Sequence, residues 1–154
     1  QMGLSILYIG CESGDDEVLG RIKKGETFAS SLAALQKISQ AGIKSSVMIL
    51  MGLGGVQLSR QHAIASAELM NAAQPDYLST LVVTLPLGTE RMDNVFDGKF
   101  VLPDQSGLLT EMHTLLSHLK LDKTIFRSDH ASNYLVLKGI LGKDKSALIT
   151  QWVN

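Results

Sequence analysis

The residues best placed to do chemistry follow an apolar run near the start of the chain, at residues 10–14 (GCESG). Glu12 is a carboxylate directly after this run, and the glycines on either side let the backbone turn sharply. A carboxylate in this position can accept hydrogen bonds from the hydroxyl groups of a ligand. Its neighbour Ser13 has a structural alternative, which is to cap a helix that begins near Asp15, with Asp16 completing a capping box.

Two further segments, at residues 52–55 (GLGG) and 84–88 (TLPLG), also follow apolar runs. The first is rich in glycine but matches neither common phosphate loop. A Walker loop ends in Gly-Lys-Ser/Thr, whereas Val56 and Gln57 follow here, and a dinucleotide fingerprint needs a third glycine at the position of Gln57. The segment is therefore a place where the backbone can closely approach a flat ligand.

A polar cluster near the end of the chain supplies the remaining candidates. It places His130 close to Arg127 and Asn133, and His130 could transfer a proton or bind a substrate. The alternative is a hydrogen-bonded loop. No catalytic residue can be assigned from these patterns.

A single cysteine, Cys11, limits the metal chemistry of the chain. One thiol forms no internal disulfide and no site built from cysteines alone, so we expect no metal site within this chain. Cys11 is expected to be a small buried hydrophobic residue.

Three apolar runs, bounded by glycine or proline, predict the strands that position these residues. Runs rich in Ile, Val and Leu are typical of parallel strands buried on both faces. Because ligands bind at the carboxyl ends of parallel strands, the three candidate segments should meet at one edge of the sheet. The runs cover residues 4–10, 43–51 and 77–85.

Helical patterns lie between and after these runs. Thr27 and Ser59 are the expected caps of the helices that separate the strands. A long loop is predicted over residues 86–103, followed by the clearest helix, which Asp104 caps. A short extended piece at 124–127 and a short helix at 143–152 complete the chain.

Composition restricts the function further. The chain has 154 residues and a formal net charge of −1, which fits one globular domain and gives no signal for nucleic-acid binding. It lacks an apolar run of about 18 residues, so no membrane span is expected. No signal peptide is visible, and we expect a cytoplasmic protein.

The strand count raises a problem of closure. Three parallel strands do not close a barrel, and a complete (β/α)₈ barrel needs about 250 residues. Unpaired sheet edges are also a hazard that proteins usually cover. Either the C-terminal region covers an edge, or another chain does, or the chain is a piece of a larger barrel.

Two long segments resemble a known family. The run YIGCESGDDEVLGRIKKGET and the later run AGIKSSVMILMGLGG resemble the second half of a radical S-adenosylmethionine (SAM) enzyme, in the Elp3-like and coproporphyrinogen-dehydrogenase-like branch. Many members of this branch have G-x-E-S-G-x-D-E-V-L and a strand that ends in G-L-P-G-E. The tail FRSDHASNYLVLKGILGKDK is also similar to tails in the superfamily.

The resemblance implies an α/β fold in which three parallel βα units form half of a partial TIM-type (β/α)₆ barrel. Residues 1–103 would supply the fourth to sixth strands, and residues 104–154 would be a C-terminal helical extension packed on the barrel. The parent protein would be an iron–sulfur oxidoreductase that uses a 4Fe–4S cluster to cleave SAM reductively, which generates a 5′-deoxyadenosyl radical.

The resemblance also implies a role for several residues. Glu12, with Ser13 beside it, falls where a polar side chain meets the ribose of SAM. Lys24 falls where a basic residue reaches the carboxylate of SAM, with Lys23 as the alternative, and a solvated helix end as the structural explanation of both. The fifth-strand motif, which packs near the adenine, is matched by Leu50, Gly52 and Leu53; a turn glycine and core leucines are the alternative.

The chain departs from the family pattern where the iron is held. The cluster ligands C-x-x-x-C-x-x-C and the Gly-Gly-Glu segment are absent, and the proline and glutamate of G-L-P-G-E are Gly54 and Val56 here. A cluster needs three thiolates from the protein. The chain is therefore expected to be a fragment that supplies part of the SAM site, and to be inactive alone.

Two other functions remain open. The first is a non-enzymatic half-barrel that self-associates through its exposed sheet edges. The second is an unrelated small-molecule α/β enzyme that uses Glu12 as a base. The sequence names no substrate, small or macromolecular.

Overall fold

The structure, a computed structural model, describes residues 5–85, 88–96, 98, 100–128, 138–140 and 145. Its strands form a single sheet in the order β1-β2-β3-β4-β5, and the first four run parallel. The short β5 pairs antiparallel with β4. The strands are β1 (Ile6–Glu12), β2 (Lys44–Met51), β3 (Tyr77–Val82), β4 (Ile125–Arg127) and β5 (Lys138–Ile140).

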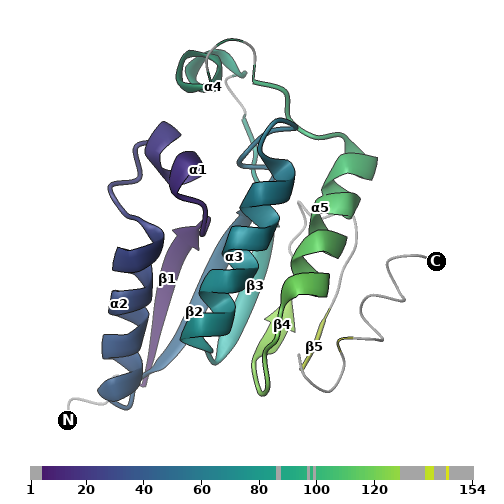
Figure 1. Ribbon diagram of the computed structural model, residues 1–154. Coiled ribbons are helices and arrows are strands. Elements are labelled where there is room, and N and C mark those ends of the chain that lie inside the picture. Colours follow the sequence, from purple (N-terminus) through teal and green to yellow (C-terminus); the bar gives the residue numbers. More distant parts are fainter. Residues whose placement is uncertain are drawn as a thin grey trace.

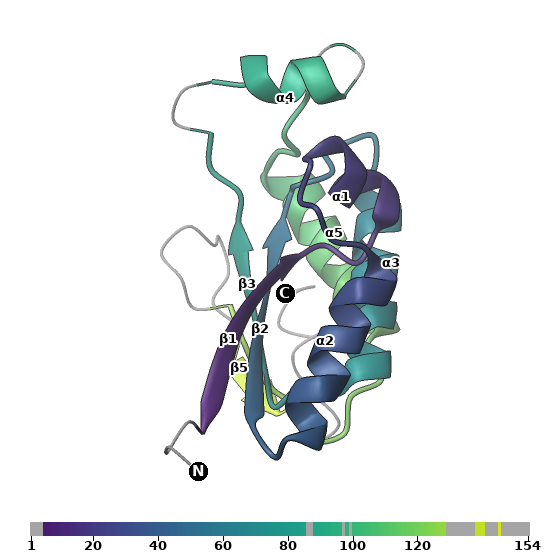
Figure 2. The same ribbon diagram turned by 90° about the vertical axis from the view of Figure 1, so that its left-hand side faces the viewer.

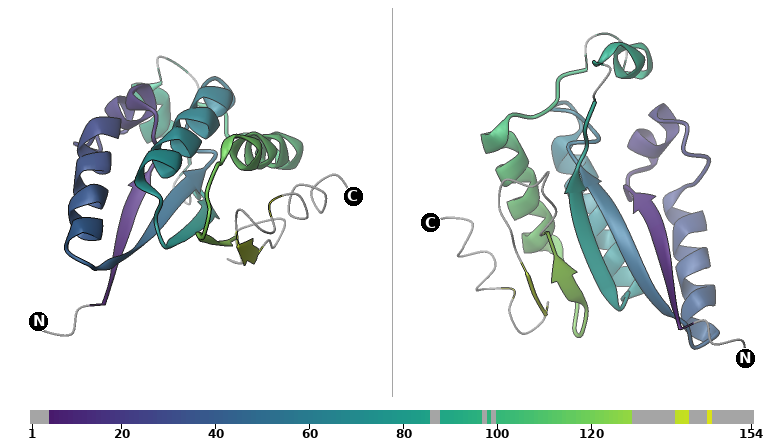
Figure 3. Two further views of the ribbon diagram at one scale, coloured as in Figure 1. Left: turned by 60° about the horizontal axis from the view of Figure 1, so that its bottom comes forward. Right: turned by 180° about the vertical axis from the view of Figure 1, so that it is seen from behind.

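Helices α1, α2, α3 and α5 lie on one side of this sheet, and α4 lies beyond the carboxyl ends of the strands (Figures 1 and 2). None of the described helices covers the other side, which is called the open face below. Viewed from behind, the strands stand in front of the helices (Figure 3, right). The helices are α1 (Asp16–Arg21), α2 (Phe28–Gln40), α3 (Ser59–Ala73), α4 (Glu90–Val95) and α5 (Gln105–His118). None of the described helices combines the length and apolar character that crossing a membrane requires.

The alternation of buried side chains explains this layering. In β2, Val47, Ile49 and Met51 are buried, whereas the residues between them are partly exposed. Successive side chains of a strand point to opposite faces, so one face of β2 packs against the helices. The leucines of α5, with Leu115 and Leu116 fully buried, complete this core.

Most of the predicted elements are confirmed, including the short extended piece, which is β4. Helix α2 begins with the expected cap at Thr27, which forms a capping box with Ser30, and Asp104 caps α5 by accepting a hydrogen bond from Gly107. The predicted loop 86–103 contains an additional short helix, α4. The predicted helix at 143–152 lies outside the described residues, apart from Lys145.

Two predicted caps are wrong. The cap of α1 is Asp15, whose carboxylate accepts the backbone N–H of Val18, because α1 begins one residue later than expected. Helix α3 has Leu58 at the capping position and no side-chain cap. The hydroxyl of Ser13 bonds to His62 and also accepts the N–H of Asp15, and the hydroxyl of Ser59 donates to Glu111 on α5.

The fold class is confirmed. Parallel strands with helices on one face only are the wall of a partial TIM-type barrel, whose interior is the open face of the sheet. The C-terminal region covers one edge, since β5 pairs with β4. Among the described strands, β1 pairs only with β2. Self-association through sheet edges stays a prediction, and the outer edge of β1 is the longer of the two edges available for it.

Candidate functional site

Glu12 occupies an unusual backbone position at the carboxyl end of β1. The register between β1 and β2 shifts between Gly10 and Glu12, which marks a β-bulge. Glu12 has φ of +68°, a left-handed conformation that is uncommon for residues other than glycine. Bulges and strained residues occur preferentially at functional sites. A Cβ placed on Gly10 would lie 3.8 Å from Oε1 of Glu12, so the carboxylate lies close to the open-face position of Gly10.

Lys24 forms an ion pair with this carboxylate. Its Nζ lies 3.3 Å from Oε1 of Glu12, and about 30% of each side chain is exposed (29% for Lys24 and 30% for Glu12). The chain reaches Lys24 through α1 and a turn in which the Lys24 N–H donates to the carbonyl of Leu19. Lys23 is exposed and has φ of +55°. The structure therefore brings Lys24, and not Lys23, to Glu12.

A buried histidine, which the sequence analysis did not select, joins the ends of β1 and β2. Nδ1 of His62 lies 2.7 Å from Oγ of Ser13, and its Nε2 lies 2.9 Å from the carbonyl oxygen of Leu50. A carbonyl only accepts, so Nε2 carries the proton, and the Ser13 hydroxyl donates to Nδ1. Burial lowers the pKa of His62 to about 4, which keeps the ring neutral.

The segment after β1 also lies directly against α3. The N–H of Gly14 donates to Oγ of Ser66 at 2.9 Å. A Cβ on Gly14 would lie 2.7 Å from the carbonyl carbon of Ala65 and 2.8 Å from Cα of Ser66. Only glycine allows this approach, so Gly14 fixes where the chain enters the candidate site.

A second buried group that the sequence analysis missed, Glu111 on α5, holds the glycine-rich segment after β2. Its carboxylate accepts the N–H of Gly52 at 2.7 Å and the hydroxyl of Ser59 at 2.7 Å. Glu111 is 1% exposed. Burial raises its pKa to about 7, although both hydrogen bonds act in the opposite direction. Gly52 has φ of +84°, so this anchor holds a turn that glycine favours.

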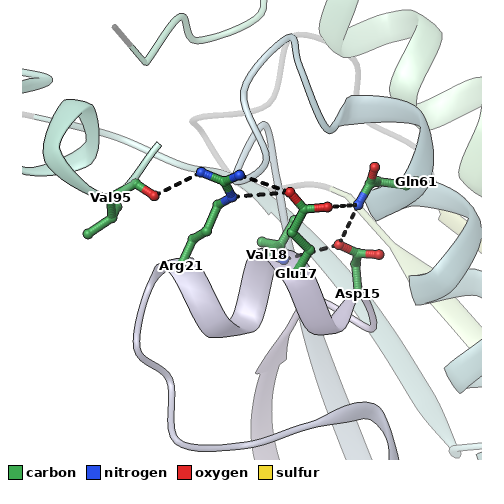
Figure 4. A network of polar contacts seen from close by, with 6 residues as sticks. All are labelled: Asp15, Glu17, Val18, Arg21, Gln61 and Val95. Atoms are coloured by element: carbon green, nitrogen blue, oxygen red, sulfur yellow. Dashed lines mark hydrogen bonds and ion pairs between the residues drawn. The ribbon is translucent and has the colours of Figure 1, made fainter. Parts of the chain in front are cut away.

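A polar network connects the segments that follow β1, β2 and β3 (Figure 4). Arg21 on α1 forms an ion pair with Glu17 at 3.0 Å and donates to the carbonyl of Val95 at the end of α4. Gln61 on α3 donates to Asp15 at 2.9 Å and to Glu17 at 3.0 Å. The network therefore holds α4 beside α1, at the end of the sheet where Glu12 lies.

The three residues of the fifth-strand motif have different surroundings. Leu50 is partly exposed, whereas Leu53 is 5% exposed and belongs to the buried side chains. The N–H of Gly52 is occupied by Glu111. These contacts agree with the structural alternative for Gly52 and Leu53, while Leu50 remains accessible.

The other candidates are separated from this group or lie outside the described residues. Arg127 is exposed at the end of β4, and His130 and Asn133 are not among the described residues.

Burial raises the pKa of the Cys11 thiol to about 11. Within the described ranges, no group of three or more His, Cys, Asp or Glu side chains could hold a metal ion.

Comparisons with known proteins identify the fold. No family model matches the sequence, and no curated protein matches it. A solved structure of Elp3 from the archaeon Methanocaldococcus infernus, with an N-terminal deletion of residues 1–46, is similar with a TM-score of 0.68 and 16% sequence identity. The match covers 99% of this chain and 36% of the Elp3 chain.

The chain has the fold of one part of Elp3. This finding confirms, at the level of fold, the resemblance to the Elp3-like branch that the motifs around Glu12 and Gly52 indicate. The chain spans 36% of the length of that Elp3 protein. The activity of the complete protein is therefore a matter of proposal.

Proposed function

We propose that this chain is the second half of the barrel of a radical SAM enzyme and contributes part of its SAM site. The observation that carries the proposal is the Glu12–Lys24 pair at the carboxyl end of β1. Glu12 follows a bulge and has a left-handed backbone conformation, and its carboxylate lies beside the open face of the sheet. Lys24 forms an ion pair with it at 3.3 Å. It lies at the strand ends, where parallel α/β folds bind ligands.

The two side chains fit complementary groups of SAM. Lys24 contacts one oxygen of Glu12 and leaves Oε2 without a partner among the described residues. A carboxylate oxygen can accept hydrogen bonds from the two ribose hydroxyls. The ammonium group of Lys24 has three donors, so it can bind the carboxylate of SAM while it remains near Glu12.

The neighbouring strand end would shape the adenine side of the site. Leu50 is the accessible member of the fifth-strand motif, and Gly52 with Leu53 would form the backbone wall that Glu111 and His62 hold in place. Ser13 bonds to His62 and not to SAM in this arrangement, so its role is to position the segment that carries Glu12. The division of the chain at residues 103 and 104 stays a prediction.

The residues of this chain do not fit the iron–sulfur cluster. Cys11 is 2% exposed, and its raised pKa disfavours the thiolate that a cluster requires. The cluster ligands would come from another part of the parent protein. In the parent protein, bound SAM would supply a 5′-deoxyadenosyl radical.

Replacing Lys24 tests this proposal against its alternative, Lys23. In the parent protein, we expect Lys24→Met to weaken SAM binding by roughly 10-fold to 100-fold, since a charge-assisted hydrogen bond contributes about 1.5 to 3 kcal/mol. Lys23→Met is the matched control, because it removes the same charge one residue away and should change the Kd less than about twofold. Isothermal titration calorimetry measures both values.

Two results of this titration would contradict the assignment. One is an equal loss of affinity in the two variants, which would indicate a general effect of charge. The other is an unchanged Kd in Lys24→Met. Glu12→Gln should also weaken binding, because the amide accepts hydrogen bonds from the ribose through one oxygen only.

A further inference from the structure

The open face of the sheet is hollowed between β1 and β4. The hollow has a volume of about 1010 Å³, and Figure 3, right, views the sheet from this side. Its lining includes the open-face residues of four strands. A hollow of this size is large enough for a small organic molecule.

Two rows of side chains cross the hollow, because the parallel strands pair in register. Residues at alternate positions of a strand share a face, so each row lies on the open side. The row farther from the carboxyl ends consists of Tyr8, Ser46, Tyr77 and Ile125. The row nearer the carboxyl ends consists of Gly10, Met48, Ser79 and Arg127.

The first row has the composition of a binding surface for a flat ring. Tyr8 and Tyr77 stand on either side of the small residue Ser46. Strands are spaced by about 4.8 Å, so the two tyrosines begin about 10 Å apart. Tyr8 is 78% exposed on β1, which pairs only with β2 among the described strands. Aromatic rings at such positions offer stacking surfaces to a ligand.

The second row contains the single charge of the hollow. Arg127 is the one charged residue among those that line it, and its guanidinium has no ion pair with the described residues. The planar guanidinium binds carboxylate and phosphate groups through two parallel hydrogen bonds. The adjacent residue of this row, Ser79 on β3, is small, which leaves space beside the guanidinium.

We propose that this hollow binds a ligand with a flat ring system and one anionic group, with Tyr8 and Tyr77 against the ring and Arg127 on the anion. The inference rests on the proposed function, in which the same face is the barrel interior and Glu12 stands beside it. The ligand is then the substrate. Carboxylate and phosphate share this chemistry, and the experiment distinguishes them.

Phenyl phosphate and benzoate are the probes, with benzyl alcohol as the uncharged control. They are titrated into the ¹⁵N-labelled 154-residue chain, and chemical-shift changes give the Kd and the location. We expect whichever of phenyl phosphate and benzoate carries the preferred anionic group to shift the amide signals of β1, β3 and β4. Benzyl alcohol should bind at least 10-fold more weakly than that probe.

Arg127→Gln should raise the Kd of the anionic probe about 10-fold. Arg60→Gln is the matched control, since Arg60 is exposed on α3, on the opposite side of the sheet, and should leave the Kd unchanged. Tyr8→Ala should weaken both the anionic probe and benzyl alcohol. All three residues are exposed or line the open hollow, so the spectra of the variants should retain the dispersion of the wild-type chain.

Equal effects of Arg127→Gln and Arg60→Gln, or perturbations confined to the helical side, would overturn this inference. A parallel titration of the parent protein with S-adenosylhomocysteine separates it from the proposed function, because this chain supplies only part of the SAM site. Binding that Lys24→Met weakens and Arg127→Gln does not would support the SAM site independently. Binding of the anionic probe at Arg127 without any binding of S-adenosylhomocysteine would keep the hollow as a ligand site and contradict the SAM site.

Discussion

Replacing Gly14 by alanine is expected to destabilise the fold by about 3 kcal/mol. The added methyl group would lie 2.7 Å from the carbonyl carbon of Ala65, so the segment after β1 would have to move away from α3. That movement would also break the hydrogen bond from Gly14 to Ser66. Urea unfolding followed by circular dichroism measures the loss.

Gly20→Ala is the matched control for this prediction. Gly20 lies in α1, and a Cβ there meets no atom within 4 Å. Alanine has the higher helix propensity by about 1 kcal/mol, so the same substitution should leave the stability unchanged or raise it. Equal midpoints for Gly14→Ala and the wild-type chain would show that the close approach to α3 is not needed.

The second large effect concerns the pH dependence of stability. Glu111 has its pKa raised to about 7, so the stability that it contributes is lost as the pH rises from about 4.5 through 7. His62 has its pKa lowered to about 4, so its contribution is lost as the pH falls from about 6.5 through 4. Each shift of about 2.5 units corresponds to roughly 3 kcal/mol. The two slopes have opposite signs between pH 4.5 and 6.5 and should largely cancel.

In Glu111→Gln, the pH dependence of stability that His62 causes should no longer be cancelled. The amide oxygen can accept the N–H of Gly52, and the amide nitrogen can donate to Ser59. Both hydrogen bonds are therefore kept, while the titratable carboxyl group is removed. We expect the free energy of unfolding of this variant to rise by roughly 3 kcal/mol from pH 4 to 6.5, whereas that of the wild-type chain stays nearly flat. Denaturant unfolding at half-unit pH steps measures both profiles.

Glu68→Gln provides the control, because Glu68 is an exposed carboxylate on α3. Its profile should follow that of the wild-type chain. Parallel profiles for Glu111→Gln and the wild-type chain would mean that folding does not shift the pKa of Glu111, and would contradict this prediction.

The sequence was sufficient to predict the elements that depend on local patterns. The strand runs and the caps at Thr27 and Asp104 are all properties of neighbouring residues. Even β4, which is only Ile125–Arg127, begins in a segment that was expected to be extended. Its place in the parallel sheet depends on pairing with β3, and the residues of β4 alone do not indicate that partner.

The supports of the candidate site could not be predicted in the same way. Glu111 lies 59 residues from Gly52, and His62 lies 49 residues from Ser13. The available signal was a polar residue on the inward face of a helix. Spacing of four places His62 with Ser66 and Met70, all of which are buried. Such a signal indicates burial but does not name the partner.

The left-handed backbone conformation of Glu12 also could not be predicted from the sequence. The flanking glycines indicated a sharp turn, and the structure places the strain on the glutamate itself. The error at Ser13 has a related cause. Its hydroxyl bonds to His62, which leaves Asp15 to cap α1.

The central claim is that the Glu12–Lys24 edge of this sheet belongs to an enzyme that cleaves SAM. The most direct test is to reconstitute the parent protein anaerobically with iron and sulfide, add dithionite and SAM, and quantify 5′-deoxyadenosine by liquid chromatography. We predict at least one equivalent of 5′-deoxyadenosine per protein, and a marked loss in Glu12→Ala. A parent protein that holds its full complement of iron and sulfide and binds SAM, but releases no 5′-deoxyadenosine, would contradict the claim.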